Sequence, residues 1–483
     1  MRKWPLWLVG ILCVQLSFAQ EQATLLGTWH NPELVPSNIA DNIYNEIWGY
    51  ANGDKEYAII GSTAGTHFID VTDPSQPTEV QFVPGKAQGG VIIHRDYHDH
   101  NGYLYAVSDE GASSLQIMDI TDIEDTVMVL YDSDELIRTA HNIFIDNEQE
   151  KLYAFATKNG LGVGFALRIY SLSDPLNPTF IAEHRTFDGL TVGHVHDGFV
   201  KDNIAFLNCG WDGFLVVDFT DPLQPVTKTK LTNYPQKGYN HSGWPSPGLD
   251  YYYMADESHG KDMKVLNVCD LEAVTVGKTF NARSIESNSI PHNQVAVCNY
   301  LYVSYYYDGL QVYDISDPKD PVRVMEYDTY PLPNDASYRG AWGVYPFLPS
   351  GNILVSDMQT GLYVFEAIDT NCTGLGITGN FEEDCEVDVN SSVQQPTRVE
   401  DWVNVYPTLV HKGDWLSLQL SATQQAVEIE MQLIDASGKT LRTYKGLVQG
   451  NNIITLPKNI SKGNYLLKVN RQDQAIVKQI VVQ

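Results

Sequence analysis

Basic residues are scarce in this 483-residue chain, which has 31 Lys and Arg against 60 Asp and Glu and a formal net charge of −29. The acidic excess lies between residues 20 and 399, because residues 400–483 carry nine basic and seven acidic side chains. A surface of this sign repels nucleic acid and anionic lipid and favours cations or basic partners. We therefore expect no nucleic-acid partner.

Long apolar runs are absent except at the N-terminus. Met1-Arg-Lys is basic, Pro5 to Leu16 is apolar, and Ser17-Phe-Ala19 is a small-x-small cleavage signal. Residues 1–19 are thus predicted to be a secretory signal peptide, which is too short to span a membrane. Because no further run of about 20 apolar residues follows, we expect no transmembrane segment in the mature chain.

Cysteines are few, and the six present never occur as Cys-x-x-Cys, a common zinc-binding spacing. Cys372 and Cys385 flank a Gly-rich loop, and in an exported chain we expect them to form a disulfide. The sequence does not pair Cys209, Cys269 and Cys298. The chain also lacks a Gly-x-Ser-x-Gly elbow, a His-Glu-x-x-His helix and a phosphate-binding loop, so no standard catalytic motif is present.

A repeat of 47 to 52 residues is the dominant pattern of the chain. Each copy has an apolar run of strand length, a Gly-containing turn, a second run that ends in aspartates, and a Pro-led third run. Where proline follows the last aspartate, as in Asp73-Pro74 and Asp317-Pro318, the pair is predicted to be a structural turn. The last aspartates of the seven copies are Asp73, Asp122, Asp174, Asp221, Asp270, Asp317 and Asp369.

This period, with about four short strands per copy, is typical of a propeller blade. We therefore predict an all-β protein with a seven-bladed β-propeller over residues 20–370. The last copy lacks its outer strand, and Ala23 to Trp29 stands before the first copy without partners. The N-terminal strand is expected to complete the last blade and remove the exposed sheet edges.

A second domain follows a polar segment. Residues 371–401 are predicted to be a disulfide loop and linker, with Asn390 to Pro396 as its polar stretch. Residues 402–483 contain seven short apolar runs, and Asp435-Ala-Ser-Gly-Lys439 has the Gly of a hairpin turn. A small immunoglobulin-like β-sandwich fits this pattern.

The C-terminal domain resembles the type A sorting domain of the Bacteroidetes type IX secretion system. The resemblance rests on Val405-Tyr-Pro407, Ile434 to Leu441, Lys462 to Val469 and the terminal Ile476 to Val482. The family usually has Tyr-Pro-Asn-Pro where this chain has Tyr406-Pro-Thr-Leu. The resemblance implies recognition by the type IX secretion machinery and a secreted or outer-membrane-surface location.

The propeller region resembles the choice-of-anchor B family, whose members carry LVIVD-type repeats. Phe214-Leu-Val-Val-Asp218 and Gly309-Leu-Gln-Val-Tyr-Asp314 carry this resemblance. It implies a common domain joined to varying anchors, which agrees with the C-terminal sorting domain. It implies no activity for particular residues.

One position near the start of each innermost strand holds an aromatic or imidazole side chain. Counting back nine to eleven residues from the second strand gives Trp48, His94, His141, His194, His241, His292 and Trp342. Imidazole is a common ligand for zinc, copper and iron, and the five His side chains are a candidate metal site. The sequence does not indicate whether the bound ion would be zinc, copper or calcium. The alternative, that each His caps its strand structurally, stays open, and Trp at two positions favours it.

The turns between the second and third strands are expected at the same mouth of the channel, with His98, His100, His196 and His259 nearby. A mixture of His, carboxylate and aromatic groups suits a small-ligand pocket. The candidate ligand-binding residues are Trp48, Asp109, Trp211, Asp212, Asp256, Tyr305, Trp342 and Asp357.

Three functions are compatible with these residues. The favoured hypothesis is a surface or secreted protein that binds an extracellular protein or glycan at the His-lined mouth. The second is a metal-dependent hydrolase or lyase that uses His141, His194, His241 and His292, with Asp109, Asp256 or Asp357 as general base. The third is a scaffold in a surface assembly with a flat contact patch.

Overall fold

The protein is described from a computed structural model, and its chain divides into two compact units, Met1–Cys385 and Glu386–Gln483. The predicted signal peptide and the predicted Cys372–Cys385 pair lie outside the described residues. No helix in the described part of the chain is long and apolar enough to cross a membrane. The structure describes residues 21–282, 289–334, 337–369, 376–379, 381, 403–406, 409–410, 415–420, 427–435, 439–448, 451–455, 460–471 and 474–482.

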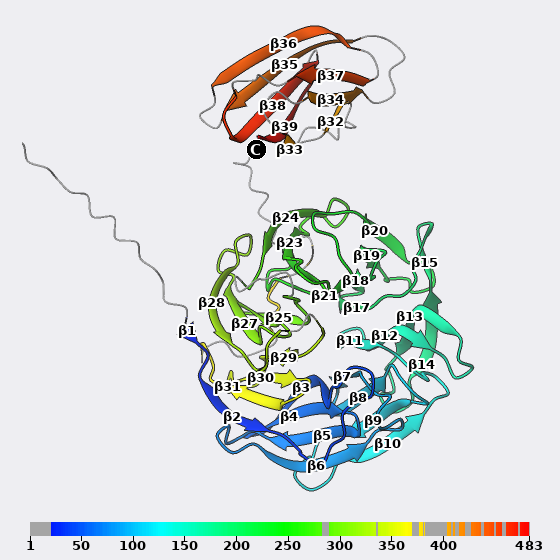
Figure 1. Cartoon of the computed structure of the whole chain (residues 1–483). Helices are drawn as coiled ribbons and strands as arrows, with labels where there is room; N and C mark the ends of the chain where they lie inside the picture. Colours follow the sequence, from blue (N-terminus) through cyan, green and yellow to red (C-terminus); the bar gives the residue numbers. More distant parts are fainter. Residues whose placement is uncertain are drawn as a thin grey trace, which may run out of the picture. The chain divides into compact units, whose positions relative to one another are not determined.

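The described residues of the first unit form six four-stranded antiparallel sheets and a seventh sheet in which four antiparallel strands are joined by the short parallel strand β1. Their innermost strands contact one another in a closed circuit, and Figure 1 shows the sheets around a central axis. The predicted all-β propeller is thereby confirmed. In chain order, blades 1 to 7 have the innermost strands β3 (Tyr44–Asn52), β7 (Arg95–His100), β11 (Asn142–Asp146), β17 (Asp197–Lys201), β21 (Asn240–Pro245), β25 (Gln294–Val297) and β29 (Ala341–Tyr345).

Each blade continues outward by hairpins. The second strands are β4 (Lys55–Ser62), β8 (Tyr103–Ser108), β12 (Lys151–Lys158), β18 (Ile204–Asn208), β22 (Tyr251–Asp256), β26 (Tyr300–Ser304) and β30 (Ile353–Asp357). The third strands are β5 (Gly65–Asp70), β9 (Leu115–Asp119), β13 (Gly164–Ser171), β19 (Phe214–Asp218), β23 (Met263–Asn267), β27 (Leu310–Asp314) and β31 (Gly361–Phe365). The outer strands of blades 1 to 6 are β6 (Thr78–Pro84), β10 (Met128–Ser133), β14 (Thr179–His184), β20 (Val226–Leu231), β24 (Thr275–Phe280) and β28 (Val322–Tyr327).

The N-terminal segment closes the ring, as the sequence predicts. Strand β2 (Leu25–Trp29) pairs antiparallel with β31 and supplies the outer strand of blade 7. The preceding β1 (Glu21–Gln22) runs parallel to β28 of blade 6. The two ends of the propeller are thus joined by backbone hydrogen bonds, and the edge of blade 7 is covered.

The repeat folds this way because the second and third strands are apolar on both faces and lie between neighbouring blades. In β19, for example, four of the five residues are buried. The aspartates that follow these strands act as turn formers, in agreement with the sequence prediction. Asp73 Oδ1 accepts a hydrogen bond from the Ser75 N–H at 3.1 Å, and Asp317 Oδ1 accepts one from Lys319 at 3.1 Å.

The three unassigned cysteines differ in state. Cys209 is a buried free thiol, whereas Cys269 and Cys298 are both disulfide-bonded. Oxidised cysteines fit an exported protein.

The second unit contains a three-stranded and a five-stranded sheet in its described residues. The first has β32 (Val403–Tyr406), β34 (Trp415–Leu420) and β37 (Asn451–Thr455); the second has β33 (Leu409–Val410), β39 (Gln474–Val482), β38 (Gly463–Arg471), β35 (Val427–Asp435) and β36 (Thr440–Val448). The predicted hairpin is present, since β35 pairs with β36 and the Asp435 N–H donates to the Lys439 carbonyl. Met431, Leu433 and Leu467 are buried. The immunoglobulin-like arrangement stays a prediction.

Candidate functional site

A ring of six aromatic side chains lies at one level of the central channel, and each comes from the start of a different innermost strand. The centroids of neighbouring rings are separated by 4.2, 4.0, 4.2, 4.4, 4.3 and 5.5 Å around the circuit. We call this the imidazole ring. In order around the channel its members are His94, His141, His196, His241, His292 and Trp342.

Two of the seven residues predicted to share one position, His194 and Trp48, lie outside the imidazole ring. In blade 4 the member of the imidazole ring is His196, and His194 lies beside it with a centroid separation of 5.9 Å. His196 is only eight residues before Ile204, outside the nine to eleven residues of the count, and its N–H donates to the Asn208 carbonyl of β18 at 2.7 Å. The short hairpin of β15 (Thr186–Phe187) and β16 (Leu190–Thr191) precedes both histidines. Trp48 belongs to a lower level, where its indole packs 4.6 Å from the ring of His98.

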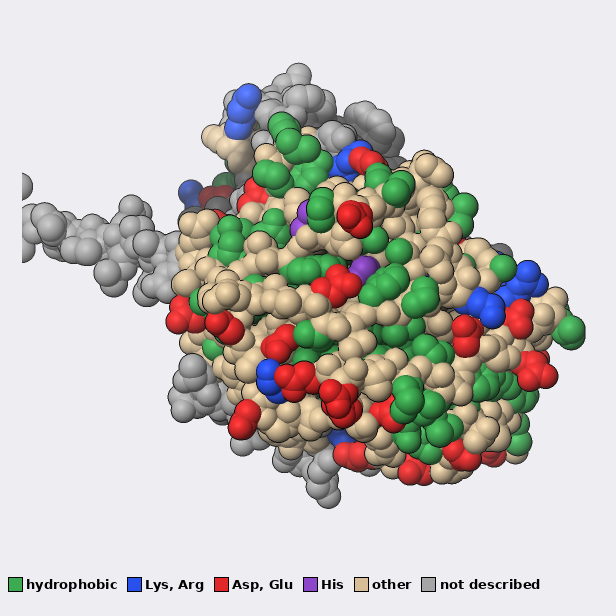
Figure 2. Space-filling model, turned by 90° about the horizontal axis from the view of Figure 1, so that it is seen from below, with side chains coloured by type: hydrophobic (Ala, Val, Ile, Leu, Met, Phe, Trp, Pro, Cys, Tyr) green, Lys and Arg blue, Asp and Glu red, His purple; other side chains and the backbone are tan. Residues whose placement is uncertain are grey.

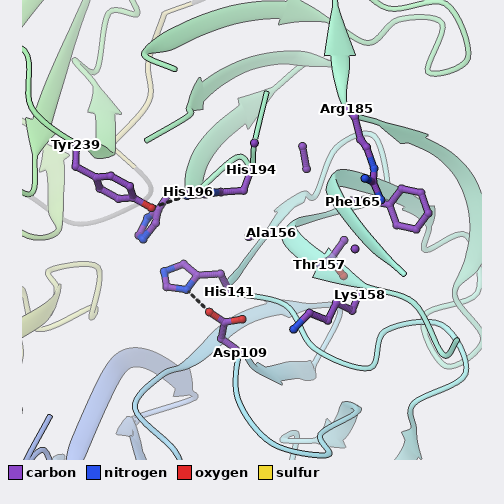
Figure 3. Close-up of a pocket in the computed structure, with 13 residues that line it drawn as sticks. Asp109, His141, Ala156, Thr157, Lys158, Phe165, Arg185, His194, His196 and Tyr239 are labelled. Atoms are coloured by element: carbon purple, nitrogen blue, oxygen red, sulfur yellow. Dashed lines mark hydrogen bonds and ion pairs between the residues drawn. The ribbon is translucent and has the colours of Figure 1, made fainter. Parts of the chain in front are cut away.

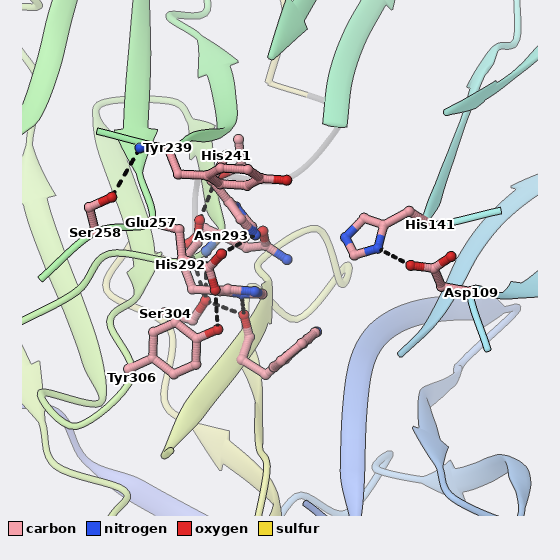
Figure 4. Close-up of polar contacts among 12 residues, drawn as sticks. Asp109, His141, Tyr239, His241, Glu257, Ser258, His292, Asn293, Ser304 and Tyr306 are labelled. Atoms are coloured by element: carbon pink, nitrogen blue, oxygen red, sulfur yellow. Dashed lines mark hydrogen bonds and ion pairs between the residues drawn. The ribbon is translucent and has the colours of Figure 1, made fainter. Parts of the chain in front are cut away.

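His141 is the member of the imidazole ring with a carboxylate partner. Its Nδ1 lies 2.9 Å from Asp109 Oδ2, as Figure 4 shows. Burial by itself would lower the pKa of His141, but the hydrogen bond and charge of Asp109, with the nearby Glu110 and Glu257, raise it above the usual value. Burial opposes ionisation of Asp109, and the His141 contact outweighs it and lowers the pKa of that carboxyl. This pair is therefore the charged element of the imidazole ring.

The other imidazoles of the ring are neutral at neutral pH. Burial, with repulsion from neighbouring imidazoles, holds the pKa of His94, His196 and His241 well below the usual value. Burial likewise lowers the pKa of His292 to about 3, and its Nδ1–H donates to the Trp342 carbonyl at 2.5 Å. A neutral imidazole keeps a lone pair, so these side chains can act as acceptors or as metal ligands.

Glu257 follows β22 and reaches the imidazole ring from blade 5. Its Oε1 accepts a hydrogen bond from the Tyr306 hydroxyl at 2.6 Å, and its Oε2 lies 3.9 Å from His241 Nε2. Burial raises the pKa of Glu257 to about 7. One ligand atom from each of His196, His241 and Glu257 lies within 4.8 Å of the others. This triplet could hold a metal ion. Two of its members, His196 and Glu257, were not among the seven residues that the sequence predicted at one position of the blades.

A cavity of about 500 Å³ opens beside the imidazole ring, between blades 3 and 4. His141, His194 and His196 form its inner wall, and Figure 3 shows Lys158 and Arg185 at its other side. His194 Nε2 and the Tyr239 hydroxyl share a hydrogen bond of 2.5 Å. The remaining lining residues are Asp109, Ala156, Thr157, Gly164, Phe165, Ala166, Gly193 and Tyr239.

The wall of this cavity contains a strained backbone position. Ala156 in β12 has a φ of 44°, in the left-handed region that residues with a Cβ seldom adopt. The β12–β13 pairing passes from Phe155↔Leu167 to Thr157↔Phe165 around it. Strain of this kind is concentrated at functional sites.

Beneath the imidazole ring lies a layer of buried carboxylates that the sequence pattern did not identify. Glu46, Asp96 and Asp197 line a small cavity of about 80 Å³ together with amide side chains such as Asn293. Burial raises the pKa of Glu46 and of Asp197 to about 7 and that of Asp96 well above its usual value. Asn293 Nδ2 donates to Glu46 Oε2 at 2.8 Å, and the Ile143 N–H donates to Asp96 Oδ2 at 2.7 Å.

The predicted ligand-binding residues separate into two groups. Asp109 lines the cavity, Trp342 belongs to the imidazole ring, and the Asp212 carboxylate accepts a hydrogen bond from the N–H of the lining residue Gly193. Trp211 is 69% exposed and packs edge-on against Tyr239 at 5.5 Å.

Three other candidates are structural. Asp256 is fully buried and pairs with Lys264 Nζ at 2.7 Å. Asp357 is fully buried and accepts hydrogen bonds from Thr329 Oγ1 and two backbone N–H groups. Tyr305 lies in an apolar core cluster of blades 5 and 6, while its neighbour Tyr306 reaches Glu257.

A short motif is shared by several members of the imidazole ring, although His100 and His184 outside the ring have it too. In blades 3, 4 and 5 the His is followed three residues later by an aromatic residue, as in His141-Asn-Ile-Phe144, His196-Asp-Gly-Phe199 and His241-Ser-Gly-Trp244. In blade 5 both positions face the channel because an irregularity between Asn240 and Ser242 interrupts the alternation of side chains. This spacing would have selected His196 over His194.

Comparison with family models identifies two parts of the chain. Residues 405–483 match the model of the secretion system C-terminal sorting domain, and residues 293–329 match the LVIVD repeat. The chain is therefore exported by type IX secretion to the cell surface or the extracellular space. No curated protein matches the chain.

Three solved structures are similar at low identity. A putative 6-phosphogluconolactonase from Bacteroides fragilis has 12% identity and a TM-score of 0.43, covering 70% of this chain and 96% of its own. A second, from Bacteroides uniformis, has 13% identity and a TM-score of 0.45, covering 73% and 96%. A fungal alcohol oxidase in complex with copper has 10% identity and a TM-score of 0.42, covering 96% and 98%. Similarity at this level assigns no activity to this chain.

Proposed function

We propose that this exported propeller binds an acidic glycan in the cavity beside the imidazole ring. The observation that carries the proposal is the composition of that cavity. Lys158 and Arg185 lie at one side, and neither has an ion-pair partner among the described residues. In a chain of net charge −29, two unpaired cations facing one cavity favour an anionic ligand.

The size and the walls of the cavity also suit a saccharide. A volume of about 500 Å³ falls within the usual range of small-ligand pockets. Phe165 and Tyr239 supply aromatic surface, and His194 supplies an imidazole. Figure 2 shows carboxylates scattered over one face of the molecule, and the net charge of −29 means that a carboxylated sugar would be attracted to few other places.

The test is calorimetric titration of the purified full chain with galacturonate dimers and trimers and with the matching neutral galactose oligomers. We expect the acidic oligomers to bind and the neutral ones to bind at least tenfold more weakly. Lys158→Met should weaken acidic binding at least tenfold. The control Lys55→Met, whose ammonium pairs with Asp70 and Glu124 in blade 1, should bind as the parent does. Equal affinity for neutral and acidic oligomers, or no binding to either, would contradict the proposal.

A metal-dependent hydrolase or lyase is the second candidate, and the donor triplet at the imidazole ring is the observation that favours it. A protein that is a scaffold alone has no use for this cavity or for the triplet. Incubation of galacturonate oligomers with the zinc-loaded chain tests the enzymatic hypothesis, because hydrolysis yields new reducing ends and lyase cleavage yields an unsaturated product.

A further inference from the structure

We infer that His196, His241 and Glu257 form a binding site for a divalent transition-metal ion of the zinc class, with coordination positions left open to water or a ligand. This site is not the predicted column of five histidines, of which it keeps His241. It also does not depend on glycan binding, which we assign to the neighbouring cavity.

The first support is the separation of the donor atoms. One ligand atom from each residue lies within 4.8 Å of the other two, and His241 Nε2 and Glu257 Oε2 are 3.9 Å apart. That distance is too long for a hydrogen bond. Two ligands on one tetrahedral ion, with metal–ligand distances of about 2.1 Å, stand roughly 3.4 Å apart. A small closure of the side chains around an ion would bring these atoms to ligand spacing.

The second support is the electrostatic situation of Glu257. Its carboxylate is largely shielded from solvent, and among the described residues it has no Lys or Arg partner within ion-pairing distance. A buried carboxylate that lacks a cation is costly unless it is protonated or binds a metal. No Lys or Arg in the described part of the chain balances the charge of Glu257. A divalent ion between Glu257 and the two imidazoles would do so.

The third support comes from the ring nitrogens. His196 Nδ1 is buried and has no hydrogen-bond partner in the described part of the chain. Buried polar atoms are nearly always satisfied by protein, water or an ion. On the opposite side, Tyr306 fixes Glu257 Oε1 and leaves Oε2 directed towards His241 (Figure 4). A support that orients a ligating carboxylate in this way is typical of metal sites.

The ligand types define the class of ion. Two imidazoles and one carboxylate suit zinc or iron(II), whereas calcium and magnesium prefer ligand sets made only of oxygen. Three protein ligands with vacant positions are characteristic of sites that bind water or a substrate on the metal. The triplet therefore differs from a closed structural zinc site.

The test uses the full chain, purified without affinity metal and dialysed against chelator and then against buffer. Zinc titration by calorimetry and elemental analysis of the loaded protein should give one ion per chain. Cobalt(II) should give a visible absorption spectrum of low coordination number, and calcium should not bind. Glu257→Gln, which keeps an acceptor for the Tyr306 hydroxyl, should weaken zinc binding at least 100-fold, and so should His241→Gln and His196→Gln.

The matched control is Glu79→Gln in blade 1. Glu79 Oε2 lies 3.4 Å from His67 Nδ1 on strands away from the channel, so this variant removes a carboxylate beside a histidine and should bind zinc as the parent does. Circular dichroism checks that each variant is folded. If a His variant fails to fold, Glu257→Gln and the cobalt spectrum of the parent decide.

Three results would overturn the inference. The first is that the parent chain binds no zinc, cobalt or copper below 100-fold molar excess. The second is that Glu257→Gln binds zinc as tightly as the parent. The third is that Asp109→Asn abolishes binding while Glu257→Gln does not, which would place the ion at His141. In each of these cases glycan binding by the metal-free chain is still measurable. The two proposals therefore fail separately.

Discussion

The channel of this propeller contains two aromatic rings, one above the other, and they differ in chemistry. The lower ring, which we call the apolar ring, closes through centroid separations of 4.6, 5.0, 5.2, 5.1, 6.0, 5.4 and 5.2 Å. Its members are Trp48, His98, Phe144, Phe199, Trp244, Phe347 and Tyr345.

Apart from His98, the apolar ring presents hydrocarbon faces and edges to the channel, and its interactions are those of a core. The imidazole ring has the same closed geometry, but five of its six members carry imidazole nitrogens, several of them unsatisfied. The innermost strands and the segments that flank them therefore supply an apolar plug at one level and a polar site at the next. We infer that the plug stabilises the fold, while the imidazole ring retains groups that a ligand can satisfy.

The strongest contrast should come from the matched pair Phe199→Ala and His196→Ala, three residues apart in the same blade. Phe199 is buried and contacts Phe144 and Trp244, so its removal should lower the free energy of unfolding by about 3–5 kcal/mol. His196 has no hydrogen-bond partner at Nδ1 among the described residues, and its removal from metal-free protein should cost roughly 1 kcal/mol. Denaturant titration of both variants checks the difference. Equal losses would show that the two rings are both simply core.

A more modest effect is expected between the rings, for Glu46→Gln. Burial raises the pKa of Glu46 from its usual value of 4.5 to about 7. The folded chain therefore keeps a proton that the unfolded chain releases, and the associated stability is present below pH 4.5 and lost as the pH rises through 7. Glutamine does not ionise, so the variant avoids this loss of stability at high pH. At pH 8 it should be more stable than the parent by roughly 2 kcal/mol.

At pH 4.5 and below, the parent and Glu46→Gln should unfold at nearly the same temperature. Thermal unfolding at about pH 4.5, 6 and 8 measures the trend. A stability difference that is the same at all three values would mean that Glu46 is ionised throughout and that its hydrogen bonds with Asn293 and Ile47 compensate for burial.

The weakest effect on stability is expected at the imidazole ring itself, for Asp109→Asn. The pKa of His141 is raised in the folded state, so the stability from this pair is present below the unfolded pKa of about 6.5 and is lost as the pH rises through the folded value. Asp109 is one-third exposed, and solvent screening limits the effect to under about 1 kcal/mol.

The direct readout for Asp109→Asn is the titration of the His141 ring protons by NMR. The pKa of His141 should fall in the variant and come closer to those of its neutral neighbours. An unchanged titration would show that Glu110 and Glu257, and not Asp109, hold the proton on His141.

Several features of the site were predictable because they recur with the repeat. His94, His141, His241, His292 and Trp342 stand at one position of successive blades, and duplication brings equivalent positions to one level of the channel. The sequence count selected His194, whereas the structure places His196 in the imidazole ring. Side chains two residues apart point to the same face of an extended chain, so the choice between them depends on where the strand begins. The sequence does not show that Lys264 and Thr329 lie against Asp256 and Asp357, two of the predicted ligand-binding residues.

Periodicity and local motifs were enough to specify the all-β propeller and the C-terminal sorting domain, since each of these is encoded in a continuous stretch of chain. Closure by the N-terminal strand was predictable because the last copy of the repeat lacks its outer strand and residues 23–29 precede the first copy without partners. The donor triplet and the layer formed by Glu46, Asp96 and Asp197 exist only in the folded protein. His196 lies in blade 4 and both His241 and Glu257 lie in blade 5, whereas Glu46, Asp96 and Asp197 come from three blades. Their proximity depends on how neighbouring sheets pack. Such contacts join residues far apart in sequence, and a repeat period of about 50 residues does not predict them.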